Sequence, residues 1–179
     1  ALEQTDQAKN TVMIFTSDHG VYLGDRGFAG KWLPHESSMR IPLIIYDPRF
    51  EPEKRTRHEH MVLTIDLAPT ILNFASTQIP RAIQGQSLLP LIHGKVDDWR
   101  TEFFYDHYYM SHRIPASEAI RTERWKYIRY MNSDPLYEEL YDLREDPDET
   151  RNLIGNVDYA FVHDLMEKKW MQWREQLRK

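Results

Sequence analysis

The chain has 179 residues, and its 41% hydrophobic and 28% charged residues are ordinary for a globular protein of one medium domain or one domain with a small appendage. Its formal net charge of −5 argues against a basic nucleic-acid binder or a binder of anionic membranes. The absence of cysteine excludes disulfides, thiolate metal sites and a cysteine nucleophile within these residues, and no apolar run approaches the roughly 18–20 residues that span a bilayer.

The first half of the sequence predicts buried strands that alternate with loops and a helix. Residues 11–16 form a short, nearly continuous apolar run, which is typical of a strand buried on both faces in a parallel sheet. Residues 17–40 hold four of the seven glycines and follow this strand directly, as functional loops often do. Residues 41–46 predict a second strand. Asp66 is placed to cap a helix over residues 67–75.

The second half has a different pattern. Residues 101–109 and 118–130 are aromatic and alternating, which predicts antiparallel strands with one solvent-exposed face. Residues 139–143 predict a further strand, and residues 157–178 an amphipathic terminal helix. The exposed strand face is expected to carry a run of basic side chains: Arg121, Arg124, Lys126 and Arg129.

The predicted fold class is therefore α/β. Residues 1–98 would form part of a mostly parallel sheet flanked by helices. Residues 99–179 would form a small antiparallel sheet with a C-terminal helix, as an α+β subdomain.

Two candidate metal ligands, Asp18 and His19, directly follow the first predicted strand. Ligands of open α/β sheets gather at the carboxyl ends of strands. One carboxylate oxygen and one imidazole nitrogen suit Mn²⁺, Zn²⁺ or Fe²⁺ better than Ca²⁺. The alternative, with equal support from spacing alone, is that Asp18 caps a turn and His19 packs beside it. Lys31 in the same loop is either a cation for an anionic substrate or a solvated surface lysine.

A series of motifs in fixed order extends over about residues 11–155 and closely resembles the sulfatase family of the alkaline-phosphatase-like superfamily. The motifs of the first half are Thr16-Ser17-Asp18-His19-Gly20, Leu23-Gly24, Gly30-Lys31, His35-Glu36-Ser37-Ser38, Arg40-Ile41-Pro42-Leu43-Ile44 and Asp66-Leu67-Ala68-Pro69-Thr70. Those of the second half are Arg121-Thr122-Glu123-Arg124-Trp125-Lys126, Glu139-Leu140-Tyr141-Asp142-Leu143 and Asp146-Pro147-x-Glu149-x-x-Asn152-Leu153.

The resemblance implies a sulfuric ester hydrolase that acts on sulfated carbohydrates or small molecules, without nucleic-acid or membrane partners. Residues 1–98 would be the C-terminal part of the catalytic domain, and residues 99–179 the C-terminal subdomain. Asp18 and His19 would be ligands of a divalent metal, for which the family favours Ca²⁺ over the transition metals. Lys31 would contact the sulfate and stabilise charge on an oxygen.

Two further histidines are candidate substrate contacts. His35 follows Lys31 by four positions and is expected to line the substrate entrance, with packing as the alternative. His107 is expected to contact a sugar or leaving group from an aromatic strand. The alternative for His107 is a strand histidine that pairs with Asp106 or another neighbour.

The sequence departs from the family in one large respect. The family's nucleophile is a formylglycine made within a Cys/Ser-x-Pro-x-Arg motif, and this sequence has no such motif. The chain is therefore expected to be a fragment, inactive alone, whose site needs an upstream part of the same protein. Family habit places such proteins in the periplasm, outside the cell or in lysosomes.

Two alternatives remain open at this stage. One is a phosphonate or phosphate ester hydrolase of the same superfamily, using Mn²⁺ or Zn²⁺. The other is a non-catalytic structural fragment.

Overall fold

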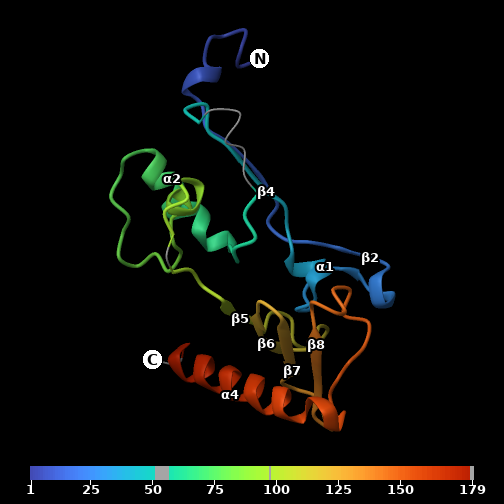
Figure 1. Cartoon of the computed structure of the whole chain (residues 1–179). Helices are drawn as coiled ribbons and strands as arrows, with labels where there is room; N and C mark the ends of the chain where they lie inside the picture. Colours follow the sequence, from blue (N-terminus) through green and yellow to red (C-terminus); the bar gives the residue numbers. More distant parts are fainter. Residues whose placement is uncertain (51–56, 97, 178–179) are drawn as a thin grey trace. The chain divides into compact units, whose positions relative to one another are not determined.

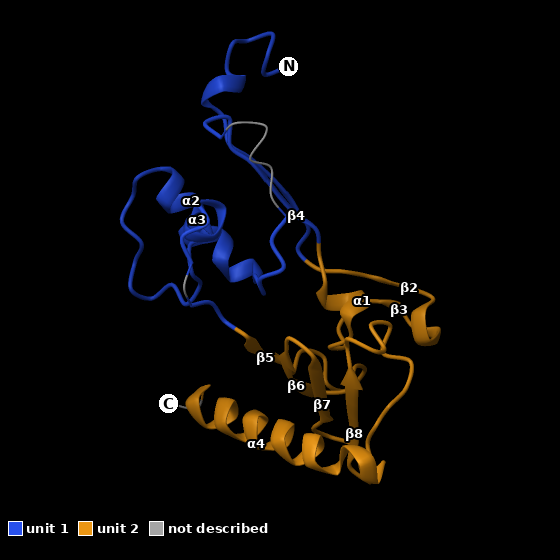
Figure 2. Cartoon of the chain, in the orientation of Figure 1, with its two compact units in different colours: residues 1–18, 42–100 blue, residues 19–41, 101–179 orange. Residues whose placement is uncertain are grey.

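The computed structural model describes residues 1–50, 57–96 and 98–177. The chain divides into two compact units, which Figure 2 colours separately. Unit 1 comprises residues 1–18 and 42–100, and unit 2 comprises residues 19–41 and 101–179. No helix within the described ranges combines the length and apolar character that crossing a bilayer requires.

In the described part of unit 1, the strand β1 (Met13–Thr16) pairs with β4 (Leu43–Tyr46). The pairing is antiparallel, so the described part of unit 1 shows none of the predicted parallel sheet. The described residues alone do not bury both faces of this ladder, because Phe15 is 63% and Ile44 61% exposed. The apolar run correctly predicts a strand. It does not predict the direction of pairing or the layers that cover the strand, because both depend on other segments.

The rest of unit 1 is organised around a buried carboxylate. Asp66 accepts hydrogen bonds from the backbone N–H groups of Leu63 and Gln86, both at 2.8 Å, and pairs with Arg100 through Nη2 at 2.8 Å. The predicted helix is confirmed, but Asp66 caps the preceding turn and makes no side-chain cap bond to that helix. The elements of unit 1 outside the ladder are η1 (Ala8–Asn10), η4 (Thr64–Asp66), α2 (Leu67–Phe74) and α3 (Leu89–Ile92).

Unit 2 is built on a four-stranded antiparallel sheet in the order β5-β6-β7-β8 (Figure 1). The predicted antiparallel sheet is confirmed, but the single stretch predicted over residues 118–130 is two strands, β6 and β7. The terminal helix is confirmed as well, and it lies along the sheet in the figure. These elements are β5 (Glu102–His107), β6 (Ser117–Thr122), β7 (Trp125–Tyr130), β8 (Tyr137–Asp142), η5 (Val157–Tyr159) and α4 (Ala160–Leu177).

One face of this sheet, called here the helix face, packs against α4. Ile120, Tyr127 and Leu140 form a buried cluster with Met166 and Trp170 of the helix. Tyr127 is the register partner of Ile120 in β6 and of Leu140 in β8, so the three side chains point to the same side of the sheet.

The opposite face, called here the loop face, is covered by residues 19–41. Tyr22 and Leu33 of this loop enter a buried cluster with Ala119, Ile128 and Tyr141. The predicted domain boundary lies close to the passage between Arg100 and Thr101, but the glycine-rich loop belongs to unit 2 and not to the first unit. The loop's elements are β2 (Tyr22–Leu23), η2 (Asp25–Gly27), β3 (Ala29–Gly30) and α1 (Glu36–Met39).

Candidate functional site

The predicted metal ligands follow β1 directly. Asp18 is exposed and closes the first segment of unit 1, and the half-buried His19 opens the loop segment of unit 2. The Nδ1 atom of His19 lies 2.6 Å from the carbonyl oxygen of Gly20. Because a carbonyl only accepts, Nδ1 carries the hydrogen, and the lone pair of the neutral ring is on Nε2. Metal-binding histidines commonly use this arrangement.

The described residues do not contain a complete metal site. No group of three or more His, Cys, Asp or Glu side chains in the described ranges is arranged to hold an ion. Asp18 and His19 fit a divalent metal by donor type, and further ligands would have to come from outside these ranges. Their assignment as metal ligands stays a prediction.

The start of the loop is pressed against α1. A Cβ atom on Gly20 would lie 2.3 Å from the carbonyl oxygen of Ser37, so only glycine fits there. The N–H of Gly20 donates to the Ser38 carbonyl at 2.8 Å, and the Ser38 hydroxyl accepts from the N–H of Trp32 at 3.2 Å. The short helix α1 thus contacts both Gly20, which follows His19, and Trp32, which follows Lys31.

Lys31 is half-buried, and its Nζ atom lies 4.8 Å from the ring centroid of Trp32. This distance is typical of a cation–π contact, in which the ammonium group faces the indole ring. The predicted contact of Lys31 with an anionic substrate stays a prediction.

His35 lies inside unit 2, at 1% exposure. Its Nδ1 atom is 2.7 Å from the Tyr22 hydroxyl, and its Nε2 atom is 2.8 Å from Oε2 of Glu139 in β8. Burial raises the pKa of Glu139. The hydrogen bonds and charges around this carboxylate, those of His35 first, together lower this pKa by more than burial raises it, so the net pKa lies below its usual value. His35 therefore links the loop to the sheet. This geometry gives no support to the predicted substrate contact and agrees with the packing alternative.

A second buried link corrects the prediction that Lys126 lies on an exposed strand face. The Lys126 side chain is 0% exposed, and its Nζ atom lies 2.7 Å from Oε1 of Glu36 and 2.5 Å from Oε1 of Glu149. Oε2 of Glu149 also accepts from the N–H of Glu36 at 2.7 Å, at the first residue of α1.

The charges in this cluster balance. Arg121 approaches Oε2 of Glu36 at 3.6 Å, which gives two cations for two carboxylates. Burial raises the pKa of Glu36, but Lys126 and then Arg121 lower it to a net value below normal. The buried cluster fixes α1, and with it the loop, on the sheet.

His107 lies on the loop face at the end of β5. Its ring centroid is 5.3 Å from that of Trp32, and its buried Nε2 atom has no hydrogen-bond partner among the described residues. Asp106 is adjacent in the strand and therefore points to the helix face, so the two side chains are not a pair. The substrate role of His107 stays a prediction.

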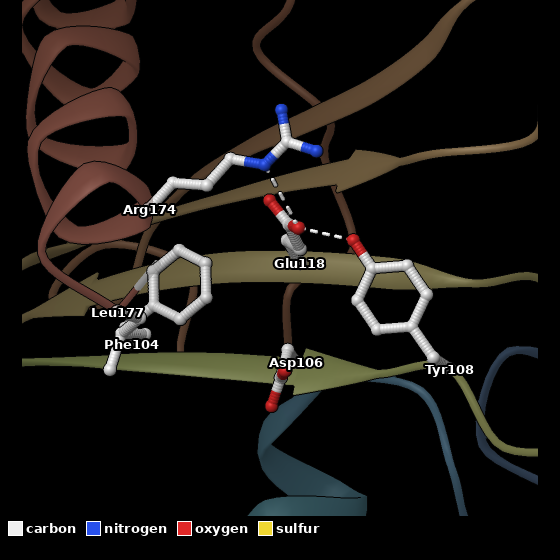
Figure 3. Close-up of a pocket in the computed structure, with 6 residues that line it drawn as sticks. All are labelled: Phe104, Asp106, Tyr108, Glu118, Arg174 and Leu177. Carbon is white, nitrogen blue, oxygen red and sulfur yellow. Dashed lines mark hydrogen bonds and ion pairs between the residues drawn. The ribbon is translucent and has the colours of Figure 1, made fainter. Parts of the chain in front are cut away.

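A cavity of about 230 Å³ opens on the helix face (Figure 3). Its carboxylate Glu118 already accepts from Tyr108, from Nε of Arg174 at 3.2 Å and from Nε1 of Trp170 at 2.7 Å. None of the predicted site residues lines it. The lining residues are Phe104, Asp106, Tyr108, Glu118, Arg174 and Leu177. We therefore regard this cavity as a gap at the edge of the helix packing.

Sequence reasoning missed the residues that hold the loop. Trp32 and Glu149 lie in or beside motifs that the sequence analysis recognises, but no local pattern indicates their partners more than 70 positions away. Tyr22 was missed as well, although its hydrogen-bond partner His35 is only 13 positions away. The one available signal was Lys126, a basic residue flanked by apolar and aromatic neighbours in a strand.

Comparisons with known proteins support the family resemblance that the ordered motifs indicate. The family described as N-sulphoglucosamine sulphohydrolase, C-terminal, matches residues 24–176. An N-acetylglucosamine-6-O-sulfatase of Bacteroides thetaiotaomicron is 35% identical over 99% of this chain and 32% of its own length. The multifunctional alkaline phosphatase superfamily protein PehA of Trinickia caryophylli is 37% identical over 97% of this chain and 36% of its own length. The chain thus spans about a third of these relatives.

Solved structures give the same result. A protein in complex with its substrate D-glucosamine-2-N,6-O-disulfate superposes with a TM-score of 0.82 at 32% identity, over 99% of this chain and 36% of that one. The phosphonate monoester hydrolase of Agrobacterium radiobacter superposes with a TM-score of 0.80 at 28% identity, over 98% and 37%.

Proposed function

Because the chain belongs to the family of N-sulphoglucosamine sulphohydrolase C-terminal domains, we propose that the protein containing it is a sulfuric ester hydrolase acting on sulfated carbohydrates. The observation that carries this proposal is the similarity to an N-acetylglucosamine-6-O-sulfatase over 99% of the chain. The match of Asp18, His19 and Lys31 to the family's motif order supports it.

The proposed reaction is hydrolysis of a sulfate monoester. We propose that the nucleophile, a hydroxyl of a formylglycine hydrate, comes from a part of the protein outside these residues. It attacks sulfur, the bond between sulfur and the bridging oxygen breaks, and the alcohol leaves with a proton. Sulfate is then released as the aldehyde re-forms, and water adds to the aldehyde to restore the hydrate. Lys31 would donate a hydrogen bond to the oxygen on which negative charge develops, which stabilises the transition state more than the ground state.

Asp18 and His19 are proposed as ligands of a divalent metal, Ca²⁺ by family resemblance. Such a metal, when bound, withdraws charge from the sulfate oxygens. The support within this chain is the donor types and the His19 tautomer, in which Nδ1 donates to the Gly20 carbonyl. The upstream part of the protein would supply the remaining ligands.

We also infer that the β1–β4 ladder belongs to a larger, mostly parallel sheet completed by other parts of the protein. The exposed apolar side chains of Phe15 and Ile44 support this inference, because two-stranded ladders with uncovered apolar faces are unstable in water. Sheets that are mostly parallel commonly include an antiparallel edge strand.

A phosphonate monoester hydrolase is the second candidate, favoured by the structural similarity to the Agrobacterium radiobacter enzyme. Mn²⁺ or Zn²⁺ would then replace Ca²⁺, which the nitrogen ligand His19 suits. A substrate panel separates the two candidates. The full-length protein is assayed with matched aryl and N-acetylglucosamine sulfates and with an aryl phosphonate, in the presence of each metal.

Hydrolysis of the sulfates with little action on the phosphonate is the expected result, and cleavage of the phosphonate alone would overturn the sulfatase proposal. Lys31→Met is expected to lower kcat by about 100-fold or more, as loss of one transition-state donor does. Lys168→Met on α4 is the matched control and is expected to keep the parent rate.

A further inference from the structure

Trp32, immediately after Lys31, has an unusual backbone conformation. Its φ angle is 100°, in the left-handed region that bulky residues rarely adopt. Such strain persists only where surrounding contacts enforce it, and it gathers at functional positions. Here the Trp32 N–H donates to the Ser38 hydroxyl at 3.2 Å, and the Tyr105 hydroxyl donates to the Trp32 carbonyl at 2.5 Å. The main chain of Trp32 is thus held on both sides.

The enforced conformation places the indole in an aromatic group of three residues, Trp32, His107 and Tyr109, called here the Trp32 platform. The indole centroid lies 5.3 Å from the His107 ring and 5.9 Å from the Tyr109 ring, with interplanar angles of 41° and 33°. Tyr109 is 65% exposed and Trp32 is half-buried, so the platform has an accessible side. All three residues belong to unit 2.

The platform adjoins a cation. Nζ of Lys31 lies over the Trp32 ring, 4.8 Å from its centroid, so one short stretch of loop presents an aromatic surface together with an ammonium group. Ligand sites commonly combine apolar, aromatic walls with a few polar groups that fix orientation. A ligand that matches this pair needs an anionic group at one end and a flat apolar face beside it.

A sulfated pyranose has both features. Its ring carries C–H groups on one face, which meet the negative face of an aromatic ring favourably, and its sulfate is the anion. We propose that the Trp32 platform binds the pyranose ring of the ester substrate while Lys31 faces the sulfate. This inference deepens the proposed sulfatase function and rests on it.

His107 has a specific part in this arrangement. Its Nε2 atom is buried and its ring centroid lies 5.3 Å from that of the indole, so we assign His107 to holding the indole in place. His107 is then a positioning residue, in place of the direct sugar contact that the sequence predicted. The exposed Tyr109 ring extends the platform outward.

The test uses the full-length protein and 6-O-sulfated N-acetylglucosamine, with KM and kcat measured separately. Trp32→Ala is expected to raise KM by about tenfold with kcat nearly unchanged, because uniform binding is lost. Trp32→Phe keeps an aromatic face and is expected to stay within about threefold of the parent. Tyr109→Ala, an exposed position that does not endanger folding, is expected to raise KM by about threefold.

Two controls separate the platform from a general disturbance of the loop. Inhibition by inorganic sulfate, which has no ring, is expected to keep the same inhibition constant in Trp32→Ala. Phe161→Ala removes an aromatic ring that is 79% exposed on α4 and is expected to leave all constants unchanged.

The platform is overturned if Trp32→Ala and Tyr109→Ala leave KM for the sugar sulfate unchanged. It is also overturned if Trp32→Ala raises the inhibition constant of inorganic sulfate by as large a factor as it raises KM for the sugar sulfate. Absence of any sulfate-ester hydrolysis by the unsubstituted protein is a different result, because it overturns the proposed function and the subsite together.

Discussion

Both faces of the unit 2 sheet bury an apolar cluster, and they differ in the ion pairs that hold their neighbours. On the helix face, Met166 and Trp170 are buried among apolar side chains, and the ion pair between Lys169 and Glu102 is partly exposed. On the loop face, the charged side chains of Lys126 and Glu149 are almost completely buried. Apolar packing tolerates small shifts, whereas a buried charge needs its partner in place. We infer that the helix face stabilises the unit and the loop face positions residues 19–41.

The largest effect is expected from Lys126→Met. This change leaves the buried carboxylate of Glu149 and the partly buried carboxylate of Glu36 without their central cation, so the free energy of unfolding is expected to fall by about 4 kcal/mol. Chemical denaturation of the full-length protein measures it. Because α1 loses its attachment, kcat for the sulfate ester is expected to fall as well. A loss below about 1 kcal/mol would show that the cluster does not hold the loop.

A slightly smaller loss is expected from Met166→Ala on the helix face. The change opens a cavity beside Trp170 in the apolar cluster, and it is expected to cost about 3 kcal/mol. Below the unfolding temperature, kcat and KM are expected to equal those of the parent. If steady-state kinetics showed a catalytic loss as large as that of Lys126→Met, the proposed division of roles between the two faces would be wrong.

The third effect concerns the stability of the protein at acid pH. The pKa of Glu139 is lower in the folded protein than its ordinary value of 4.5, so its contribution to stability is complete above that value. The contribution disappears as the pH falls through the folded pKa. Glu139→Gln, which cannot titrate, is expected to be less stable than the parent at about pH 6. The difference should shrink toward about pH 3, as followed by urea unfolding at each pH. A difference that grows as the pH falls would contradict the His35–Glu139 assignment.

The smallest effect is expected from Lys169→Met. This substitution is the matched counterpart of Lys126→Met, but the Lys169 side chain is 33% exposed and its partner Glu102 24%. Solvent screens such a pair, so the cost is expected to stay below about 1 kcal/mol. Thermal unfolding of the two variants side by side gives the comparison, and equal losses would remove the distinction between buried and exposed pairs.

Local sequence patterns were enough to predict the antiparallel strands and the terminal helix of unit 2, but not the turn that divides residues 118–130 into β6 and β7 or the short elements of the loop. Alternation along strands and helical spacing follow from burial on one side of an element, so they can be read from neighbouring residues. Spacing alone left Asp18 and His19 open between a turn and a metal site, and the resemblance to the sulfatase family carried their assignment and that of Lys31, which stays a prediction.

Long-range pairing was not predictable in the same way. The contacts His35–Glu139 and Glu36–Glu149 join positions more than 100 residues apart, and neither end has a periodic signal. Lys126 looked solvent-exposed because charge normally indicates surface, and the paired carboxylates that permit its burial come from two other segments. The antiparallel pairing of β1 and β4 was missed because an apolar run does not encode direction.

Amide hydrogen exchange of the full-length protein, with and without Lys126→Met, tests most directly whether the loop face positions residues 19–41. The account predicts that amides of residues 19–41 exchange much faster in the variant, while those of α4 (residues 160–177) change far less. An increase as large in α4 as in the loop would contradict it, because the buried cluster would then stabilise the whole unit without specifically positioning the loop.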